Sequence, residues 1–374
     1  MGGRESEFKM RRVTITLMPL ALCVLVIASR ITRNGTFFGL DFNLFQPDGR
    51  FYLWEVYRFL GKSNFQAWAK VTSFYQNLHL VSTHYSSVIS PLNDLGLRRD
   101  MYSRPLYPLL STPFVAIGGA AGMLVIPILS FIACCYLVVF SFQNDGRKIF
   151  AFIGFALLCT SPFILRGFIS DYTDPLLALL ILIAVVLLRH KYQNFWIVCL
   201  LSLLGEATRP SEPLWILISL LFLYSSKKLK FLLLAISHLI FFGMIAVLTP
   251  DSVGTSTRGG YSPLVRLWDF IPHALKIMVI DISEIAILDR ILFALLIIYL
   301  FSILRVKRRK LDYVALLLLL VTIAMSAWNG AVGTGWRYEL PAFCPMLITL
   351  IDLIPAKWVD LVDLKLLNRL EKEN

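Results

Sequence analysis

The sequence is poor in charged residues and contains no spaced set of metal ligands and no internal repeat. Only 16% of its 374 residues are Asp, Glu, Lys or Arg, whereas about a quarter of the residues of a soluble globular protein are charged. All six cysteines lie in or beside apolar runs, and neither they nor the five histidines follow the spacing of a zinc site. These absences argue against a soluble enzyme of ordinary composition and against a zinc centre built by the protein.

Long apolar runs fill most of the chain instead. Hydrophobic residues make up 57% of the sequence, and its mean hydropathy is +0.71. The runs are about 17 to 24 residues long, which matches the ~30 Å hydrocarbon core of a bilayer. We therefore predict an all-α, polytopic membrane protein of about ten transmembrane helices, with spans near 13–30, 118–141, 149–165, 173–189, 194–207, 213–226, 230–249, 285–304, 311–328 and 338–355.

The formal net charge is +12, and most of the excess lies in short segments between these runs. The basic segments are 4–12, 147–148, 189–191, 227–230, 305–310 and 357–372. Since Lys and Arg are enriched in cytoplasmic loops, we expect both termini in the cytoplasm. Lys and Arg beside a membrane also attract anionic lipid headgroups, so the predicted partners of these segments are membrane lipids, and no nucleic acid is expected.

This orientation places two longer segments on the extracytoplasmic side. The first, 31–117, contains an aromatic and basic stretch from Phe51 to Val71 that is typical of an amphipathic helix in the headgroup layer. Its last part, 105–117, fits a separate span, a re-entrant helix or an interfacial helix. The second segment, 250–284, begins with Gly, Ser and Thr and continues as an aromatic amphipathic run. Residues 356–374 are predicted to form a cytoplasmic amphipathic tail.

Ionisable residues gather at the extracytoplasmic ends of the predicted helices. Ionised groups at the edge of the hydrocarbon are costly unless they are paired or hydrated, and they mark functional sites by default. Arginine binds phosphate oxygens through paired hydrogen bonds, and a carboxylate can accept the proton of a hydroxyl nucleophile. The pattern favours a polar cavity for a lipid-linked phosphate, formed by residues drawn from Asp41, Asp48, Arg50, Glu55, Arg104, Arg166, Asp171, Asp174, Glu206, Arg209, Glu212, Arg258, Arg337 and Glu339.

Five short motifs on this side resemble, in the expected order, those of the class C glycosyltransferases (the GT-C superfamily). The family elements are D-x-x-x-Y in the first outer loop, R-x-L-x-P before the next helix, T-E-P-L, A-x-R-P and a late R-Y-x-x-P. The matching residues are Asp48-Gly49-Arg50-Phe51-Tyr52, Arg104-Pro105-Leu106-Tyr107-Pro108, Thr173-Asp174-Pro175-Leu176, Ala207-Thr208-Arg209-Pro210 and Arg337-Tyr338-Glu339-Leu340-Pro341. Asp replaces the Glu of the third element, and Gly49 stands where an Asp-Glu pair would have its second acid.

The resemblance implies one transmembrane domain over residues 1–355 with a long first outer loop. It implies transfer of a sugar (a hexose such as mannose, or a pentose) from a polyprenyl-phosphate donor to a hydroxyl of a glycan, lipid or protein acceptor, with inversion. The implied general base is Asp48, and Asp174 orients the acceptor or holds a divalent cation (Mg or Mn) with Asp48. The implied phosphate and substrate ligands are Arg209 and Arg337, then Arg104 and Arg258, with Tyr52 and Tyr338 beside them.

The two acids have structural interpretations as well. Asp48 lies in a Pro-Asp-Gly sequence, which favours a turn by itself, and Asp41 is the main competitor for the role of base. Asp174 precedes Pro175, and an Asp before Pro suits the N-cap of a helix.

The basic residues and the remaining acids have similar alternatives. Arg104 and Arg209 precede proline at a helix start, where capping or interface anchoring explains them equally well. Arg337 follows an aromatic residue and fits an aromatic and basic belt. The acids Glu206, Glu212 and Glu339 are interpreted as structural partners of neighbouring arginines, and Arg166 with Asp171 as a local pair.

Two rival functions stay open from the sequence. A polymerase or ligase of lipid-linked glycans also needs arginines and a large loop on the outer side. A lipid or polysaccharide flippase or transporter is the non-enzymatic alternative, although such proteins commonly contain internal repeats or broken helices with charges at the midplane. The expected location is a bacterial inner membrane, with the site on its extracytoplasmic side.

Overall fold

The computed structural model describes residues 25, 35–37, 40–42, 49–77, 104–142, 146–248, 263–305, 310–329 and 336–355. Within these ranges the chain is helical, apart from one short antiparallel hairpin. The hairpin consists of β1 (Gly35–Phe37) and β2 (Leu40–Phe42), and Thr36 pairs with Asp41. The predicted all-α class is confirmed. The expected first span and the tail 356–374 lie outside the described residues, except for Leu25.

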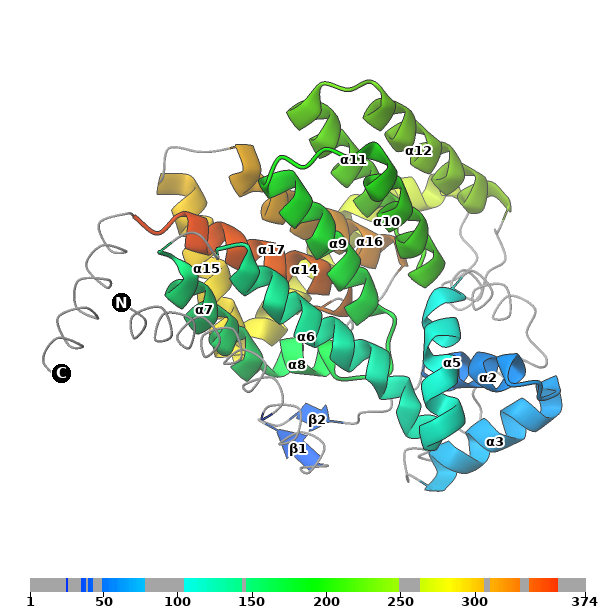
Figure 1. Cartoon of the computed structure of the whole chain (residues 1–374). Coiled ribbons are helices and arrows are strands. Elements are labelled where there is room, and N and C mark those ends of the chain that lie inside the picture. Colours follow the sequence, from blue (N-terminus) through cyan, green and yellow to red (C-terminus); the bar gives the residue numbers. More distant parts are fainter. Residues whose placement is uncertain are drawn as a thin grey trace, which may run out of the picture.

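Most of the helices begin and end close to the predicted boundaries, and Figure 1 shows their order. They are α2 (Gly49–Phe59), α3 (Asn64–Asn77), α5 (Leu106–Gly118), the 3₁₀ helix η2 (Gly119–Leu124), α6 (Val125–Phe140), α7 (Lys148–Thr160), α8 (Pro162–Phe168), α9 (Asp174–Arg189), α10 (Phe195–Thr208), α11 (Glu212–Ser226), α12 (Lys230–Leu248), α14 (Pro263–Leu288), α15 (Arg290–Arg305), η3 (Lys310–Tyr313), α16 (Val314–Asn329) and α17 (Trp336–Asp352).

Helix α9 lies at the centre of the bundle. Almost every residue from Asp174 to Leu188 is buried, because α9 packs against α6, α10, α11 and α17. Its leucines, valines and alanines belong to both of the larger hydrophobic clusters. Since α9 is apolar all round and covered on every side, it fixes the positions of the segments that enter and leave it.

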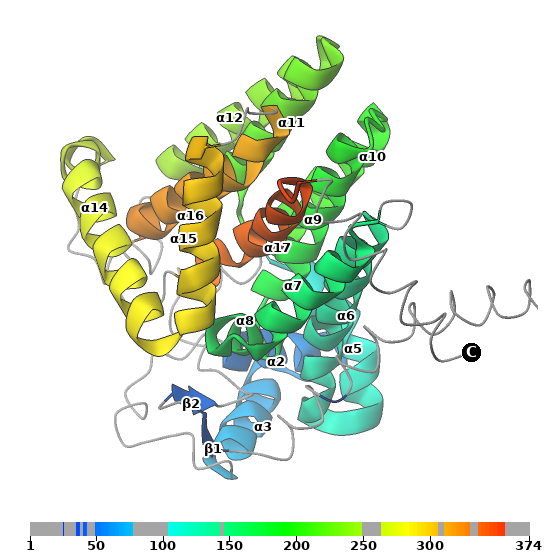
Figure 2. The same ribbon diagram turned by 90° about the vertical axis from the view of Figure 1, so that its left-hand side faces the viewer.

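Helices α2, α3 and α5 form a separate hydrophobic cluster at one end of the molecule. Trp54 of α2, Val71 of α3 and Tyr107 of α5 are fully buried in it. Figure 2 shows α2, α3 and the hairpin grouped at the lower end, while α10, α11 and α12 extend to the opposite end. The described helices of the long first segment therefore pack together at one end of the bundle.

Two predictions are wrong, one about the continuity of a span and one about the end of a segment. The expected span 149–165 is broken between α7 and α8, which are bent by 83°. Proline lacks a backbone N–H and so interrupts the helix at Pro162, while the Ser161 hydroxyl accepts a hydrogen bond from Ile164 N at 3.1 Å and caps α8. The second outer segment was expected to end at 284, but α14 continues to Leu288.

Asp289 stabilises both of these breaks. One of its carboxylate oxygens accepts a hydrogen bond from Leu292 N at 3.0 Å and caps α15. The other oxygen accepts hydrogen bonds from the Ser161 hydroxyl (2.5 Å) and from Phe163 N (3.1 Å) at the start of α8. A single buried acid thus joins the start of α8 to the start of α15, which explains why both helices change direction there.

The chain also turns between α5 and α6. Gly119 has a φ of +63°, which favours glycine, and a side chain at Gly122 would overlap the backbone of Phe114. Residues Leu106–Gly118 form a helix packed against α2 and against η2, which fits all three alternatives for 105–117: a separate span, a re-entrant helix and an interfacial helix.

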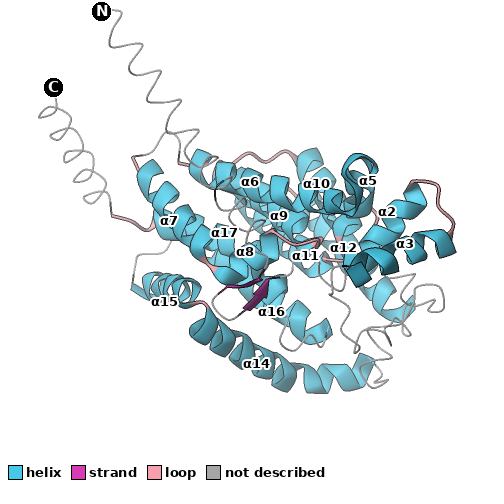
Figure 3. Cartoon of the chain, turned by 90° about the horizontal axis from the view of Figure 1, so that it is seen from below, coloured by secondary structure: helices cyan, strands magenta, loops and turns pink. Residues whose placement is uncertain are grey.

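By length and apolar composition, one helical stretch among the described residues is suited to cross a membrane, Leu106–Phe140 with 35 residues. The bent pair α7 and α8 gives a second stretch if it is counted as one span. The other apolar helices are shorter, such as α10 with 14 residues, and a 14-residue helix is only about 21 Å long. Figure 3, seen from below, shows α14 along the side of the bundle opposite α6 and α10.

Candidate functional site

Asp174 and Arg209, two of the predicted site residues, form an ion pair. The Arg209 guanidinium donates a hydrogen bond to the Asp174 carboxylate, and the two side chains are 6% and 3% exposed. Asp174 lies in the first turn of α9, where Thr173 and not Asp174 occupies the N-cap position. Arg209 follows α10 with an extended backbone. Asp174 therefore orients the guanidinium across two helix ends, and the N-cap interpretation of Asp174 is wrong.

Tyr52 and Arg104 form a second pair. A terminal guanidinium nitrogen of Arg104 donates a hydrogen bond to the Tyr52 hydroxyl at 3.1 Å. The Tyr52 ring packs edge to face against Tyr107, with centroids 5.4 Å apart, and the Tyr107 hydroxyl donates to Met123 O at 2.8 Å. These contacts fix Arg104 at the start of α5 against α2.

Asp171, which was interpreted from the sequence as a local partner of Arg166, contacts a distant helix in the structure. It is fully buried, and its carboxylate accepts a hydrogen bond from the Tyr75 hydroxyl of α3 at 2.8 Å. Burial and the neighbouring Asp171 carboxylate hold the pKa of Tyr75 well above its ordinary value, so the hydroxyl remains a donor. Asp171 therefore binds a helix far away in the sequence, which a local pair with Arg166 does not explain.

Gly49 joins the first outer segment to Asp171. A side chain at position 49 would overlap the Asp171 carboxylate, so only glycine permits the start of α2 to lie this close. Asp171 is separated by two residues from Asp174, which binds Arg209. The backbone of Gly49, which follows Asp48 in the sequence, is thereby held beside the loop that leads to Asp174.

The acids Glu206 and Glu212 were interpreted as partners of arginine. In the structure, one Glu206 oxygen accepts a hydrogen bond from Ser211 N at 3.0 Å, and the other lies 3.7 Å from Nδ1 of His238 in α12. Glu212 lies in the first turn of α11, where the helix dipole favours negative charge. Glu206 thus stabilises the turn that carries Arg209.

The C-terminal motif begins α17. Arg337 and Tyr338 lie in its first turn, and α17 packs against α8 and α9. Glu339 is buried, and its carboxyl group lies near enough to that of Asp281 in α14 for negative charges on the two acids to repel each other. Asp48 and Arg258, as well as the side chains of Arg337 and Tyr338, lie outside the described residues.

Holding a divalent cation with Asp48 was one of the two roles considered for Asp174. Asp174 binds the Arg209 guanidinium, and a guanidinium repels a cation at the same carboxylate. Among the described residues, no group of three or more His, Cys, Asp or Glu side chains has the arrangement of a metal site. Asp48, the other ligand in that interpretation, lies outside the described residues.

The arrangement can bind an anion and position a hydroxyl. The guanidinium groups of Arg209, after α10, and Arg104, before α5, supply donors, and the Asp174 carboxylate and the Tyr52 hydroxyl orient them. Such donors are fixed before a substrate arrives, which is the property that electrostatic catalysis requires. Comparison of the chain with protein-family models, with curated proteins and with solved structures finds no match.

Proposed function

We propose that this chain is an integral-membrane glycosyltransferase of the GT-C type that uses a polyprenyl-phosphate sugar as donor. The observation that carries the proposal is the placement of Gly49, the residue after Asp48, against Asp171, close in sequence to the Asp174–Arg209 pair. The Gly49 contact ties the start of α2 to the loop before α9, and the Asp174–Arg209 pair ties the start of α9 to the loop after α10. In the proposal these segments supply the base and the phosphate clamp of one site.

In the proposed reaction, the acceptor hydroxyl gives its proton to Asp48 as its oxygen attacks the anomeric carbon of the donor. The bond between that carbon and the phosphate oxygen breaks, and the prenyl phosphate leaves with the electron pair. Because the new bond forms opposite the leaving group, the configuration inverts. Arg209 and Arg337, assisted by Arg104 and Arg258, stabilise the negative charge that develops on the phosphate.

The test incubates purified full-length protein with a panel of polyprenyl-phosphate monosaccharides and measures free prenyl phosphate and glycosylated product. Asp48→Asn should lower turnover by roughly 10²–10⁴-fold, the usual contribution of a general base. Asp41→Asn is the matched control and should retain turnover. Full activity of Asp48→Asn removes it from the mechanism, and no transfer from any donor argues against the function. A ladder of products favours the polymerase alternative.

The ten-span topology, with its site on the extracytoplasmic side of a bacterial inner membrane, belongs to the same proposal. It is supported by the basic segments between the apolar helices, as in 227–230 between α11 and α12. A membrane-impermeant thiol reagent applied to intact cells should label cysteines introduced at Gly254 and Gly333, but not at Lys228 or Arg308. The reverse labelling pattern would contradict the orientation.

A further inference from the structure

A cavity of about 560 Å³ lies between the C-terminal half of α2, the turn into α3 and the start of α5. The turn is tight because Gly61 adopts a φ of +80° and its N–H donates to Arg58 O at 2.9 Å. The Trp54 indole N–H donates to Asn64 O at 3.2 Å and fixes α3 against α2. The lining residues are Glu55, Arg58, Phe59, Lys62, Ser63, Asn64 and Pro105.

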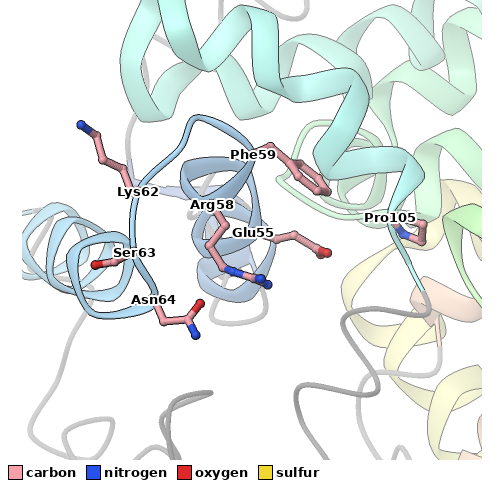
Figure 4. A pocket seen from close by; sticks show the side chains of 7 residues that line it. All are labelled: Glu55, Arg58, Phe59, Lys62, Ser63, Asn64 and Pro105. Atoms are coloured by element: carbon pink, nitrogen blue, oxygen red, sulfur yellow. The ribbon is translucent and has the colours of Figure 1, made fainter.

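Two opposite charges point into this cavity. Figure 4 shows Glu55 and Arg58 directed into the space between α2 and Pro105, whereas Lys62 points away from it. The Arg58 guanidinium packs over the Trp54 ring at 4.9 Å, which limits its freedom. Glu55 and Arg58 are three residues apart on one helix, so their side chains are neighbours.

One oxygen of the buried Glu55 carboxyl has no hydrogen-bond donor in the described part of the chain. The residue is only 2% exposed, and its Oε2 atom accepts no hydrogen bond from any described residue. Burial raises the pKa of Glu55 to about 7, and the attraction of Arg58 offsets only part of this effect. A buried carboxylate without a donor is costly, and a ligand with an N–H donor would remove this cost.

We propose that this cavity binds the headgroup of an aminophospholipid, with its primary ammonium on Glu55 and its phosphate on Arg58. A simple anion in the cavity would be repelled by Glu55, and a simple cation would be repelled by Arg58. A zwitterion with two carbons between ammonium and phosphate places its two charges about as far apart as side chains one helical turn apart. A quaternary ammonium has no N–H and leaves the carboxylate without a hydrogen bond.

The lipid source is favoured by the surface around the cavity. Phe59 and Phe65, on α2 and α3, are 44% and 75% exposed. Large apolar side chains next to basic ones on paired amphipathic helices suit the boundary between headgroups and acyl chains. This inference concerns lipid binding and does not depend on the proposed sugar transfer.

The experiment is native mass spectrometry of the full chain in detergent with an equimolar mixture of phosphatidylethanolamine, phosphatidylcholine and phosphatidylglycerol. We expect preferential retention of phosphatidylethanolamine. Glu55→Gln should reduce its preference over phosphatidylcholine by roughly tenfold, because a charge-assisted hydrogen bond is lost. Arg58→Gln should weaken retention of both zwitterionic lipids. The matched control is Lys70→Gln, which removes a charge from a side chain that packs over the Tyr57 ring and does not line the cavity, and it should change retention less than twofold.

Equal retention of the three lipids, or preference for phosphatidylglycerol, overturns the proposal. So does an unchanged preference in Glu55→Gln. Free phosphoethanolamine in large excess should compete only weakly, since it lacks acyl chains, and complete displacement at low concentration would show that the ligand is soluble and not a lipid. Melting temperatures of the variants control for folding. None of these measurements needs a sugar donor, so they remain informative if the transfer assay fails.

Discussion

Removing one partner of the Asp174–Arg209 pair leaves a buried charge without its counter-ion. Arg209 and Asp174 are 5% and 2% exposed, so water cannot replace the missing partner. Breaking a buried ion pair typically costs about 3–5 kcal/mol. We therefore expect Arg209→Met and Asp174→Leu each to lower the free energy of unfolding by about that amount.

The double variant should be more stable than either single variant. Two apolar side chains of similar volume restore a neutral interior, and such replacements are often neutral or stabilising. The free energies of unfolding of the wild type, the two single variants and the double variant are measured in mixed detergent micelles as a double-mutant cycle. The Arg189–Asp352 pair is the matched comparison, because its bonds of 3.0 and 2.7 Å join side chains that are each 17% exposed, and breaking it should cost less.

Sugar transfer separates the structural and catalytic roles of Arg209. If Arg209 also binds phosphate, the double variant regains stability but not turnover, and the loss of one preorganised donor corresponds to roughly 10²–10³-fold in rate. Single and double variants that unfold with additive costs would refute the idea that the two side chains are coupled. A stable double variant with full turnover would leave Arg209 with a purely structural role.

Two further predictions follow from close contacts and burial in the first outer segment. The methyl group of Gly49→Ala must displace the Asp171 carboxylate, and we expect this variant to lower the free energy of unfolding by about 1–3 kcal/mol. The methyl group of Gly118→Ala enters open space, so this variant should lower the free energy of unfolding much less. Equal losses of stability in the two variants would contradict the contact between Gly49 and Asp171. The pKa of Glu55 rises from 4.5 to about 7 on folding, so burial of the ionised form lowers stability as the pH rises from 4.5 to 7, by up to about 3 kcal/mol. Glu55→Gln should remove this pH dependence in micelles without aminophospholipid, and chemical unfolding at pH 5 and pH 8 tests whether it does.

The sequence determined the helical class and most helix boundaries. The prediction 173–189 became α9 (Asp174–Arg189), and 213–226 became α11 (Glu212–Ser226). These boundaries are local, because apolar runs end where proline, glycine or charged residues stop the pattern. The sequence also selected Asp174, Arg209 and Arg104, since ionisable side chains beside apolar runs stand out from their neighbours, whereas Tyr52 was selected by the resemblance of 48–52 to the D-x-x-x-Y element.

Only the tertiary structure decided which of these side chains meet. Tyr75 and Asp171 are 96 residues apart in the sequence, yet their side chains share a hydrogen bond. Asp289 caps α15 and also binds the start of α8, which breaks a span that the sequence alone presented as continuous. Such pairings depend on how helices that are distant in the sequence pack against one another, and no local pattern encodes packing between distant segments. The physical reason is that helix formation is a property of neighbouring residues, whereas a site depends on the relative positions of helices.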